Sequence, residues 1–165
     1  MFYGRNWIAV IVVILGLVMF VPVAQAQRQV IEGISCGTST YNTVQASPGE
    51  IWIATFDGKG IFRSTHESKW ADNNTFHQVG VIKAAGGKAS WNGFSKNLRT
   101  DGDIVIWEFS GDSESGTTMK VIYGTGKMKG AKGEMTSKAI TTGKPIVQGT
   151  DQMCWKNVGW IELAK

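Results

Sequence analysis

Short apolar runs that alternate with polar residues dominate the chain after residue 27. Alternation with a period of two is typical of a β-strand with one buried face, and the clusters of Gly, Asn, Asp and Ser between the runs indicate turns. No convincing apolar stripe at helical spacing occurs, and residues 66–74 suit one helical turn or a long loop. The pattern predicts strands at 28–34, 50–56, 59–65, 75–84, 89–98, 103–109, 118–124, 132–140, 145–149 and 157–163.

Two turn signals stand out between these strands. Asp57-Gly58 predicts a hairpin, because Asp-Gly supplies the positive φ angles of a type I′ turn. Thr100-Asp101-Gly102 is a second signal of this kind. Many short strands joined by turns predict either a β-sandwich or a β-barrel. Glycines inside strands favour the barrel, since they allow the bends that closure needs, and they are Gly80, Gly93, Gly133 and Gly159.

A barrel that crosses an outer membrane is the rival all-β interpretation. It needs strands with one wholly apolar, lipid-facing side. Lysines occur on both faces of the predicted strands, as Lys83, Lys96 and Lys120 show. We therefore expect a water-soluble barrel with no transmembrane span after the leader.

The N-terminus has the three parts of a secretory signal peptide. Arg5 provides a positive charge, residues 8–23 are continuously apolar, and Ala24-Gln25-Ala26 offers small residues for cleavage. The sequence thus predicts a signal peptide at 1–26, a single domain at 27–165, and export to the periplasm or the medium. A retained transmembrane anchor is the alternative, although the apolar run is shorter than the roughly 20 residues that span a bilayer.

Composition limits the remaining classes of protein. With 165 residues, 42% of them hydrophobic, the chain has material for one core. The net charge of +4 is too mild to indicate a nucleic-acid partner. Cys36 and Cys154 lie near the two ends of the mature chain, and an oxidising compartment favours a disulfide between them. Two separate buried thiols, or a metal pair, are the alternatives, but neither histidine is spaced with a cysteine as metal ligands are.

Aromatic and ionisable residues provide the candidates for a site. Tryptophan is abundant, and in a small barrel it either fills the core or forms the wall of a ligand cavity. Glu108 lies in the most apolar strand and shares a face with Ile104 and Ile106, which predicts a carboxyl group in an apolar interior. The catalytic candidates are Glu108 and His77, and the ligand-binding candidates are Trp52, Trp91, Trp107, Glu108 and Trp160. We expect no metal and no cofactor.

Residues 124–133 (GTGKMKGAKG) are rich in Gly and Lys but do not satisfy the phosphate-loop pattern, since Met128 follows Lys127. Together with Lys120, Lys138 and Lys144 they predict either a solvated strand edge or a patch that attracts anions or lipid headgroups.

Residues 101–135 carry a family resemblance. Asp101-Gly102-Asp103, an apolar strand ending at Phe109, and the glycine spacing of 123–133 resemble the strand-turn-strand of the allene oxide cyclase barrel-like superfamily and its bacterial members. Tyr123 and Met128 depart from the usual glycine and aromatic residue. The resemblance implies an eight-stranded, antiparallel, lipocalin-like barrel and an apolar pocket, but the residues of cyclase activity have no counterpart here.

Three hypotheses for function follow. The first is an exported barrel that binds a small apolar or amphipathic ligand in its interior. The second is an isomerase- or lyase-type enzyme that uses the same pocket. The third is a structural or interaction protein of the cell envelope with no pocket. We favour the first.

Overall fold

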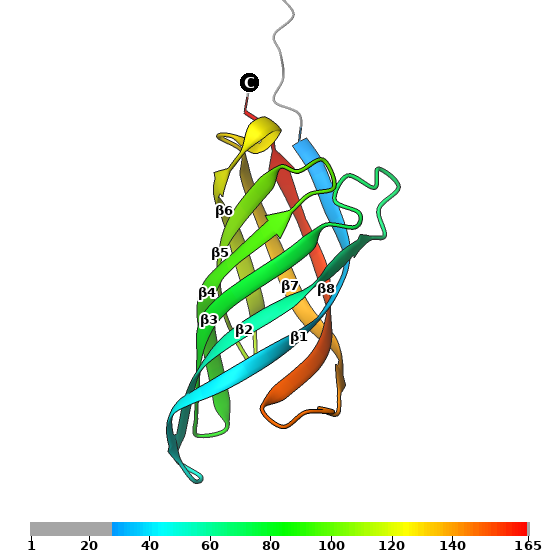
Figure 1. Cartoon of the computed structure of the whole chain (residues 1–165). Helices are drawn as coiled ribbons and strands as arrows, with labels where there is room; N and C mark the ends of the chain where they lie inside the picture. The colour runs from blue at the N-terminus through cyan, green and yellow to red at the C-terminus, as the bar shows by residue number, and fades with distance from the viewer. Residues whose placement is uncertain (1–27, 165) are drawn as a thin grey trace, which may run out of the picture.

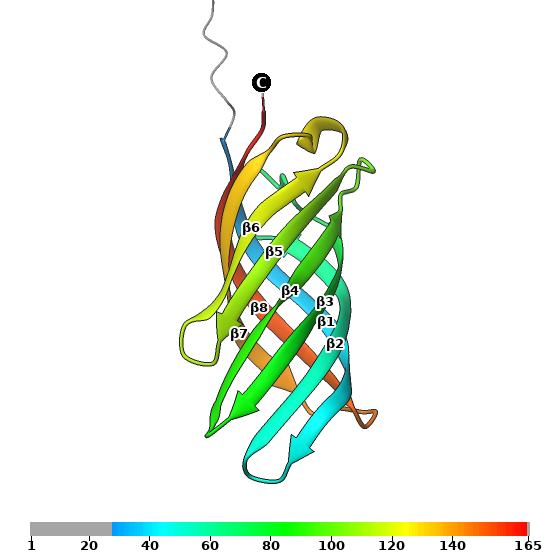
Figure 2. The ribbon, with the colours of Figure 1, turned by 90° about the vertical axis from the view of Figure 1, so that its left-hand side faces the viewer.

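Eight antiparallel strands close into a barrel in the computed structural model, which describes residues 28–164 (Figure 1). The strands follow one another around the barrel in chain order, and β8 pairs with β1 to close it, as the side view in Figure 2 shows. The all-β, eight-stranded prediction is confirmed, while the predicted signal peptide lies outside the described residues. The strands are β1 (Arg28–Ser47), β2 (Ile51–Ser64), β3 (Thr75–Ala85), β4 (Lys88–Leu98), β5 (Ile104–Asp112), β6 (Gly116–Gly124), β7 (Lys132–Gly143) and β8 (Thr150–Glu162).

The two ends of the barrel differ in their connections. The longer β2–β3 and β6–β7 connections, at 65–74 and 125–131, lie at the end where β1 begins and β8 finishes. The β4–β5 loop lies there too, and we call this the closed end. The four hairpin turns lie at the other end, which we call the open end, and they are 48–50, 86–87, 113–115 and 144–149.

The closed end holds the apolar core. Alternating residues of β5, namely Val105, Trp107 and Phe109, point inward and are almost fully buried. The connections contribute Ala71 and Met128, the latter from a short 3₁₀ turn (Gly126–Met128), and both are buried against this core. Two loop residues therefore plug the end of a barrel whose strands alone would leave it open.

The structure corrects three local predictions. Asp57-Gly58 is not a turn, because the predicted strands 50–56 and 59–65 form the single strand β2. Residues 35–47 are mostly polar, and their pattern does not predict a strand, yet they continue β1. The pairing with neighbouring strands, rather than an apolar pattern of their own, keeps these residues extended. Residues 145–149 are a turn and not a strand. The second predicted turn, at 100–102, is confirmed between β4 and β5.

Glycines inside the strands allow close packing of phenylalanine rings. Gly80 lies opposite Gly93, and a Cβ atom on Gly80 would lie 2.3 Å from the carbonyl oxygen of Asn92 and 2.7 Å from the ring of Phe56. A Cβ atom on Gly60 would lie 2.5 Å from the ring of Phe76. Small residues here let aromatic rings lie flat along the inside of a strongly curved sheet.

The predicted disulfide between Cys36 and Cys154 is confirmed. The two residues lie directly opposite each other in the β1–β8 ladder, so the bond spans the seam where the barrel closes. Their side chains belong to the face of the two strands that points away from the interior, because Ser35 and Asn157, of the opposite parity, point inward. No helix in residues 28–164 has the length and apolar character needed to cross a membrane.

Candidate functional site: the barrel cavity

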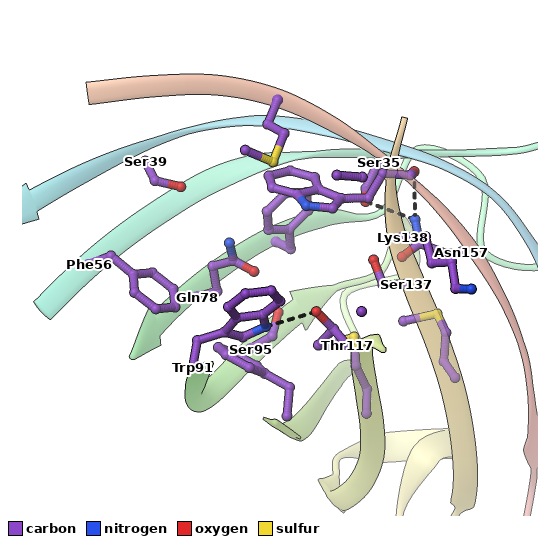
Figure 3. Close-up of a pocket in the computed structure, with 18 of the residues that line it drawn as sticks. Ser35, Ser39, Phe56, Gln78, Trp91, Ser95, Thr117, Ser137, Lys138 and Asn157 are labelled. Atoms are coloured by element: carbon purple, nitrogen blue, oxygen red, sulfur yellow. Dashed lines mark hydrogen bonds between the residues drawn. The ribbon is translucent and has the colours of Figure 1, made fainter. Parts of the chain in front are cut away.

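A cavity of about 510 Å³ occupies the barrel interior above the closed-end core and reaches the open end at the β5–β6 turn. Inward-facing residues of all eight strands line it, because strand closure directs every second side chain to the same interior. Its apolar wall includes Phe56, Phe62, Phe76, Trp91, Phe109 and Met135. Its polar wall includes Asn97 and, as labelled in Figure 3, Ser35, Ser39, Ser95, Ser137 and Asn157.

A tyrosine–carboxylate pair lies toward the open end of the cavity. The hydroxyl group of Tyr41 in β1 donates a hydrogen bond of 2.5 Å to Oδ2 of Asp151 in β8. The backbone N–H of Ser39 donates to Oδ1 of the same carboxylate at 3.2 Å. The ring of Tyr41 packs against Trp52 and Phe56, with ring centroids 5.7 Å and 6.1 Å apart. The pair is therefore held by the β1–β8 seam and by an aromatic cluster.

This environment raises the pKa of the Tyr41 phenol well above its ordinary value. Burial contributes most, because it disfavours the charged phenolate, and the hydrogen bond to Asp151 and the negative charge of that carboxylate act in the same direction. Tyr41 is therefore a hydrogen-bond donor throughout the physiological pH range.

The polar residues deeper in the cavity bond to one another. The side-chain amide of Asn157 donates to Oγ of Ser35 at 2.8 Å and to the carbonyl oxygen of Trp155 at 3.1 Å. The indole N–H of Trp91 donates to Oγ1 of Thr117 at 2.9 Å, as drawn in Figure 3. Within residues 28–164 no buried side-chain N or O atom lacks a hydrogen-bond partner. These hydrogen bonds hold part of the polar wall in place without any contact from a ligand.

The predicted tryptophans occupy different places. Trp91 lines the cavity. Trp107 is buried in the closed-end core, where it borders a separate space of about 30 Å³. Trp52 and Trp160 lie outside the cavity wall: Trp52 donates to Oγ1 of Thr43 at 3.1 Å, and Trp160 packs beneath the guanidinium group of Arg28. Only one of the four is positioned to touch a molecule in the cavity.

The expectation that Glu108 points into the interior is wrong. Trp107 and its alternating neighbours take the inward positions of β5, so Glu108 is exposed on the outer face, opposite Phe94 and Lys120. His77 is also exposed, and its Nε2 lies 2.9 Å from Oδ2 of Asp57. This hydrogen bond lowers the pKa of Asp57. Neither predicted catalytic candidate faces the cavity.

Tyr41 and Asp151 are the site residues that sequence reasoning missed. Residues 36–47 are polar, and no strand was predicted there. The signal for this strand in the sequence is the period-two series Ser35, Gly37, Ser39 and Tyr41, which places small or polar residues on one face of an extended strand.

The Gly/Lys-rich stretch has a structural explanation. Gly126 adopts φ +50°, and a Cβ atom there would lie 1.8 Å from Oδ1 of Asp103. The Asp103 carboxylate accepts the backbone N–H of Lys127 at 3.0 Å, so a protein carboxylate takes the place that an anion would need. The lysines do not form one patch either, since Lys127 and Lys129 lie at the closed end and Lys138 and Lys144 lie toward the open end. Within residues 28–164 no cluster of three or more His, Cys, Asp or Glu could hold a metal ion.

Comparisons with known proteins identify the fold. The sequence matches no protein-family model and no curated protein. The structure is similar to that of the pterocarpan synthase dirigent protein GePTS1, with a TM-score of 0.54 and 11% identity over 83% of this chain and 93% of that one. It is also similar to the pterocarpan synthase dirigent protein PsPTS1, with a TM-score of 0.51 and 10% identity over 86% of this chain and 99% of that one. The chain therefore has the eight-stranded barrel fold seen in dirigent proteins.

Proposed function

We propose that this protein binds a small, mostly apolar molecule inside the barrel. The observation that carries the proposal is the cavity of about 510 Å³, whose surface is mostly apolar, with polar groups between its aromatic and methionine side chains. Ligand sites typically enclose roughly 300–1,000 Å³ and combine apolar walls with a small number of polar groups that orient the ligand. An envelope protein without a pocket, the third hypothesis, does not require such a space.

The Tyr41–Asp151 pair indicates the chemistry of the ligand. Asp151 accepts hydrogen bonds from Tyr41 and Ser39, and an ionised carboxylate has capacity for further donors. The pair therefore favours a ligand whose hydroxyl or N–H group donates to Asp151, and it disfavours a carboxylate ligand by charge repulsion. Of the ligand-binding residues that the sequence predicts, Trp91 is the one that lines the cavity, and we propose it as a ligand contact.

A second candidate is an enzyme that uses the same cavity. The Asp151 carboxylate lies beside the cavity and is oriented by the Tyr41 hydroxyl, which suits Asp151 to act as a general base while Tyr41 remains a hydrogen-bond donor. The structural neighbours are named as synthases, which makes this candidate worth testing. If the ligand that co-purifies with the protein from its own host is converted by fresh wild-type protein but not by the Asp151→Asn variant, the enzyme is favoured over the binding protein.

The cellular setting and wider kinship are also proposals. A leader at 1–26 and the Cys36–Cys154 disulfide together support export to the periplasm or the medium, because such bonds persist in oxidising compartments. The barrel fold supports kinship with the allene oxide cyclase barrel-like superfamily.

The binding proposal is tested with a neutral apolar dye and a matched pair of variants. Ser137 in β7 points into the cavity and is 8% exposed, whereas the adjacent Thr136 points outward. In fluorescence titrations with Nile red, we expect Ser137→Phe to weaken binding at least about tenfold by filling the cavity, and Thr136→Phe to bind like the wild type. Circular dichroism establishes that both variants are folded. Equal affinity of a folded Ser137→Phe variant and the wild type contradicts the proposal.

A further inference from the structure

The open end carries apolar side chains that the barrel does not bury. Ile146 and Val147, in the β7–β8 turn, are 84% and 63% exposed. Among the large apolar residues of 28–164, Ile146 has the largest exposed fraction. A turn is normally rich in polar residues, so two adjacent branched aliphatic residues at its tip need an explanation.

Two β-bulges add further apolar side chains at the same end. The β1–β2 ladder shifts register between Thr43 and Gln45, which leaves Val44 as the extra residue, 68% exposed. The β7–β8 ladder shifts between Ala139 and Thr141, which leaves Ile140 as the extra residue, 52% exposed. Bulges redirect side chains, and here each one turns an aliphatic group toward solvent. The strands β7, β8 and β1 are neighbours, and the backbone N–H of Tyr41 in β1 donates to the carbonyl oxygen of Gly149 in the β7–β8 turn at 2.9 Å, so the bulge of β1 follows the part of that strand that contacts the turn.

Lysines accompany these apolar residues. Lys138 and Lys144 flank the bulge at Ile140 and the tip at Ile146, and both are exposed. Neither forms an ion pair with another residue of 28–164, whereas Lys88 and Lys120 pair with Glu114 and Glu134. Unpaired lysines beside exposed aliphatic tips are complementary to a surface with an apolar interior and an anionic boundary.

We propose that this rim, consisting of Val44, Ile140, Ile146, Val147, Lys138 and Lys144, docks on an anionic lipid bilayer. The aliphatic tips enter the boundary between headgroups and acyl chains, and the two ammonium groups meet lipid phosphates. A protein partner fits the rim less well, because lysine is depleted from protein–protein interfaces and aromatic residues are enriched there. The docked orientation turns the mouth of the cavity toward the membrane. Lys138 is the one rim residue that also lines the cavity, and docking does not depend on ligand binding.

Co-sedimentation with lipid vesicles tests the proposal. The vesicles consist of phosphatidylcholine with phosphatidylglycerol as the minor component. The wild type and all variants are prepared with the same N-terminus, namely that of the protein isolated from its own host. We expect Ile146→Ser/Val147→Ser to lower the partition coefficient at least about tenfold, because two aliphatic side chains no longer leave water. Ile122→Ser is the matched control: Ile122 is also an exposed residue at a bulge, on β6 near the closed end, and its replacement should leave binding unchanged.

The charge contribution has its own control. We expect Lys144→Glu to weaken binding about fivefold or more, since each lysine near an anionic surface contributes on the order of 1 kcal/mol. Lys129→Glu, which makes the same charge change at the closed end, should have little effect. The cavity-filled Ser137→Phe variant should dock like the wild type, so a failure of the ligand proposal is distinguishable from a failure of this one. Absence of wild-type binding, equal binding of Ile146→Ser/Val147→Ser, or equal binding to pure phosphatidylcholine overturns the proposal; binding to a protein partner alone does so too.

Discussion

At the scale of single residues, Tyr41 and Asp151 determine the polarity of the cavity. The phenol of Tyr41 is a hydrogen-bond donor, and the Asp151 carboxylate is the acceptor. The carboxylate is also held by the backbone N–H of Ser39 in β1. Burial raises the pKa of Tyr41, and the hydrogen bond to Asp151 raises it further. The protonated phenol is thus part of the folded state.

The first prediction concerns the alkaline titration of Tyr41. Its folded-state pKa is raised above the unfolded value of 10.0, so its contribution to stability is complete below pH 10 and is lost as the pH rises through the folded pKa. Absorbance at 295 nm should show a tyrosine that ionises late, and Tyr41→Phe should remove that component. In Asp151→Asn the component should shift to lower pH but stay raised, because burial persists. A titration unchanged by Tyr41→Phe would refute the assignment.

At the scale of elements, glycines and bulges shape the strands. Inward-facing glycines make room for phenylalanine rings, while bulges at Val44, Ile122 and Ile140 insert single residues that leave the regular ladder. Both devices break the strict alternation of a flat strand, and both increase local twist and bending. A barrel of eight strands requires such bending to close.

The second prediction tests a glycine in the curved sheet. A Cβ atom on Gly93 would lie 2.1 Å from the carbonyl oxygen of Val79, a backbone atom that cannot move without disturbing the β3–β4 ladder. We expect Gly93→Ala to lower the free energy of unfolding by about 1–3 kcal/mol, as overpacking does elsewhere. At Gly143 in β7 the nearest atom would be 3.4 Å away, so Gly143→Ala should change it by less than about 0.5 kcal/mol. Urea unfolding measures both, and equal effects would argue against a steric cause.

At the scale of the whole molecule, the barrel is asymmetric. The closed end is filled by core side chains and by two connections, and the Arg99 guanidinium there stacks on Trp70 at 4.2 Å and pairs with Asp101. That ion pair lowers the pKa of Asp101. The open end has a cavity, short turns and exposed aliphatic tips. One end therefore stabilises the fold, which leaves the other available for a ligand or a surface.

The third prediction concerns the seam. The Cys36–Cys154 bond links the first and last strands across a sequence separation of 118. In the chain-entropy model a loop of this length is worth roughly 4–5 kcal/mol. The Cys36→Ser/Cys154→Ser variant should lose about 3–5 kcal/mol of unfolding free energy in urea but keep the β-sheet circular dichroism spectrum. Dithiothreitol should destabilise the wild type by a similar amount and leave the variant unaffected. A variant as stable as the oxidised wild type would show that strand pairing alone holds the seam.

The sequence by itself determined the all-β class, and it favoured the barrel over the sandwich and a disulfide between its two cysteines. Period-two alternation is a local property of extended strands, and two cysteines in one oxidised chain have a single intramolecular partner each. Only the tertiary structure decided which side of each strand faces inward. In β5 both faces carry apolar residues. The sequence therefore allows either the face with Ile104, Ile106 and Glu108 or the face with Val105 and Trp107 to point inward, and only the closed barrel shows that the second one does. The tertiary structure also decided that Asp57 and Gly58 lie within β2 and not in a turn, and that Tyr41 contacts Asp151, 110 positions away. The reason is that pairing across the whole sheet, and not the residues of one strand alone, determines which strands are neighbours.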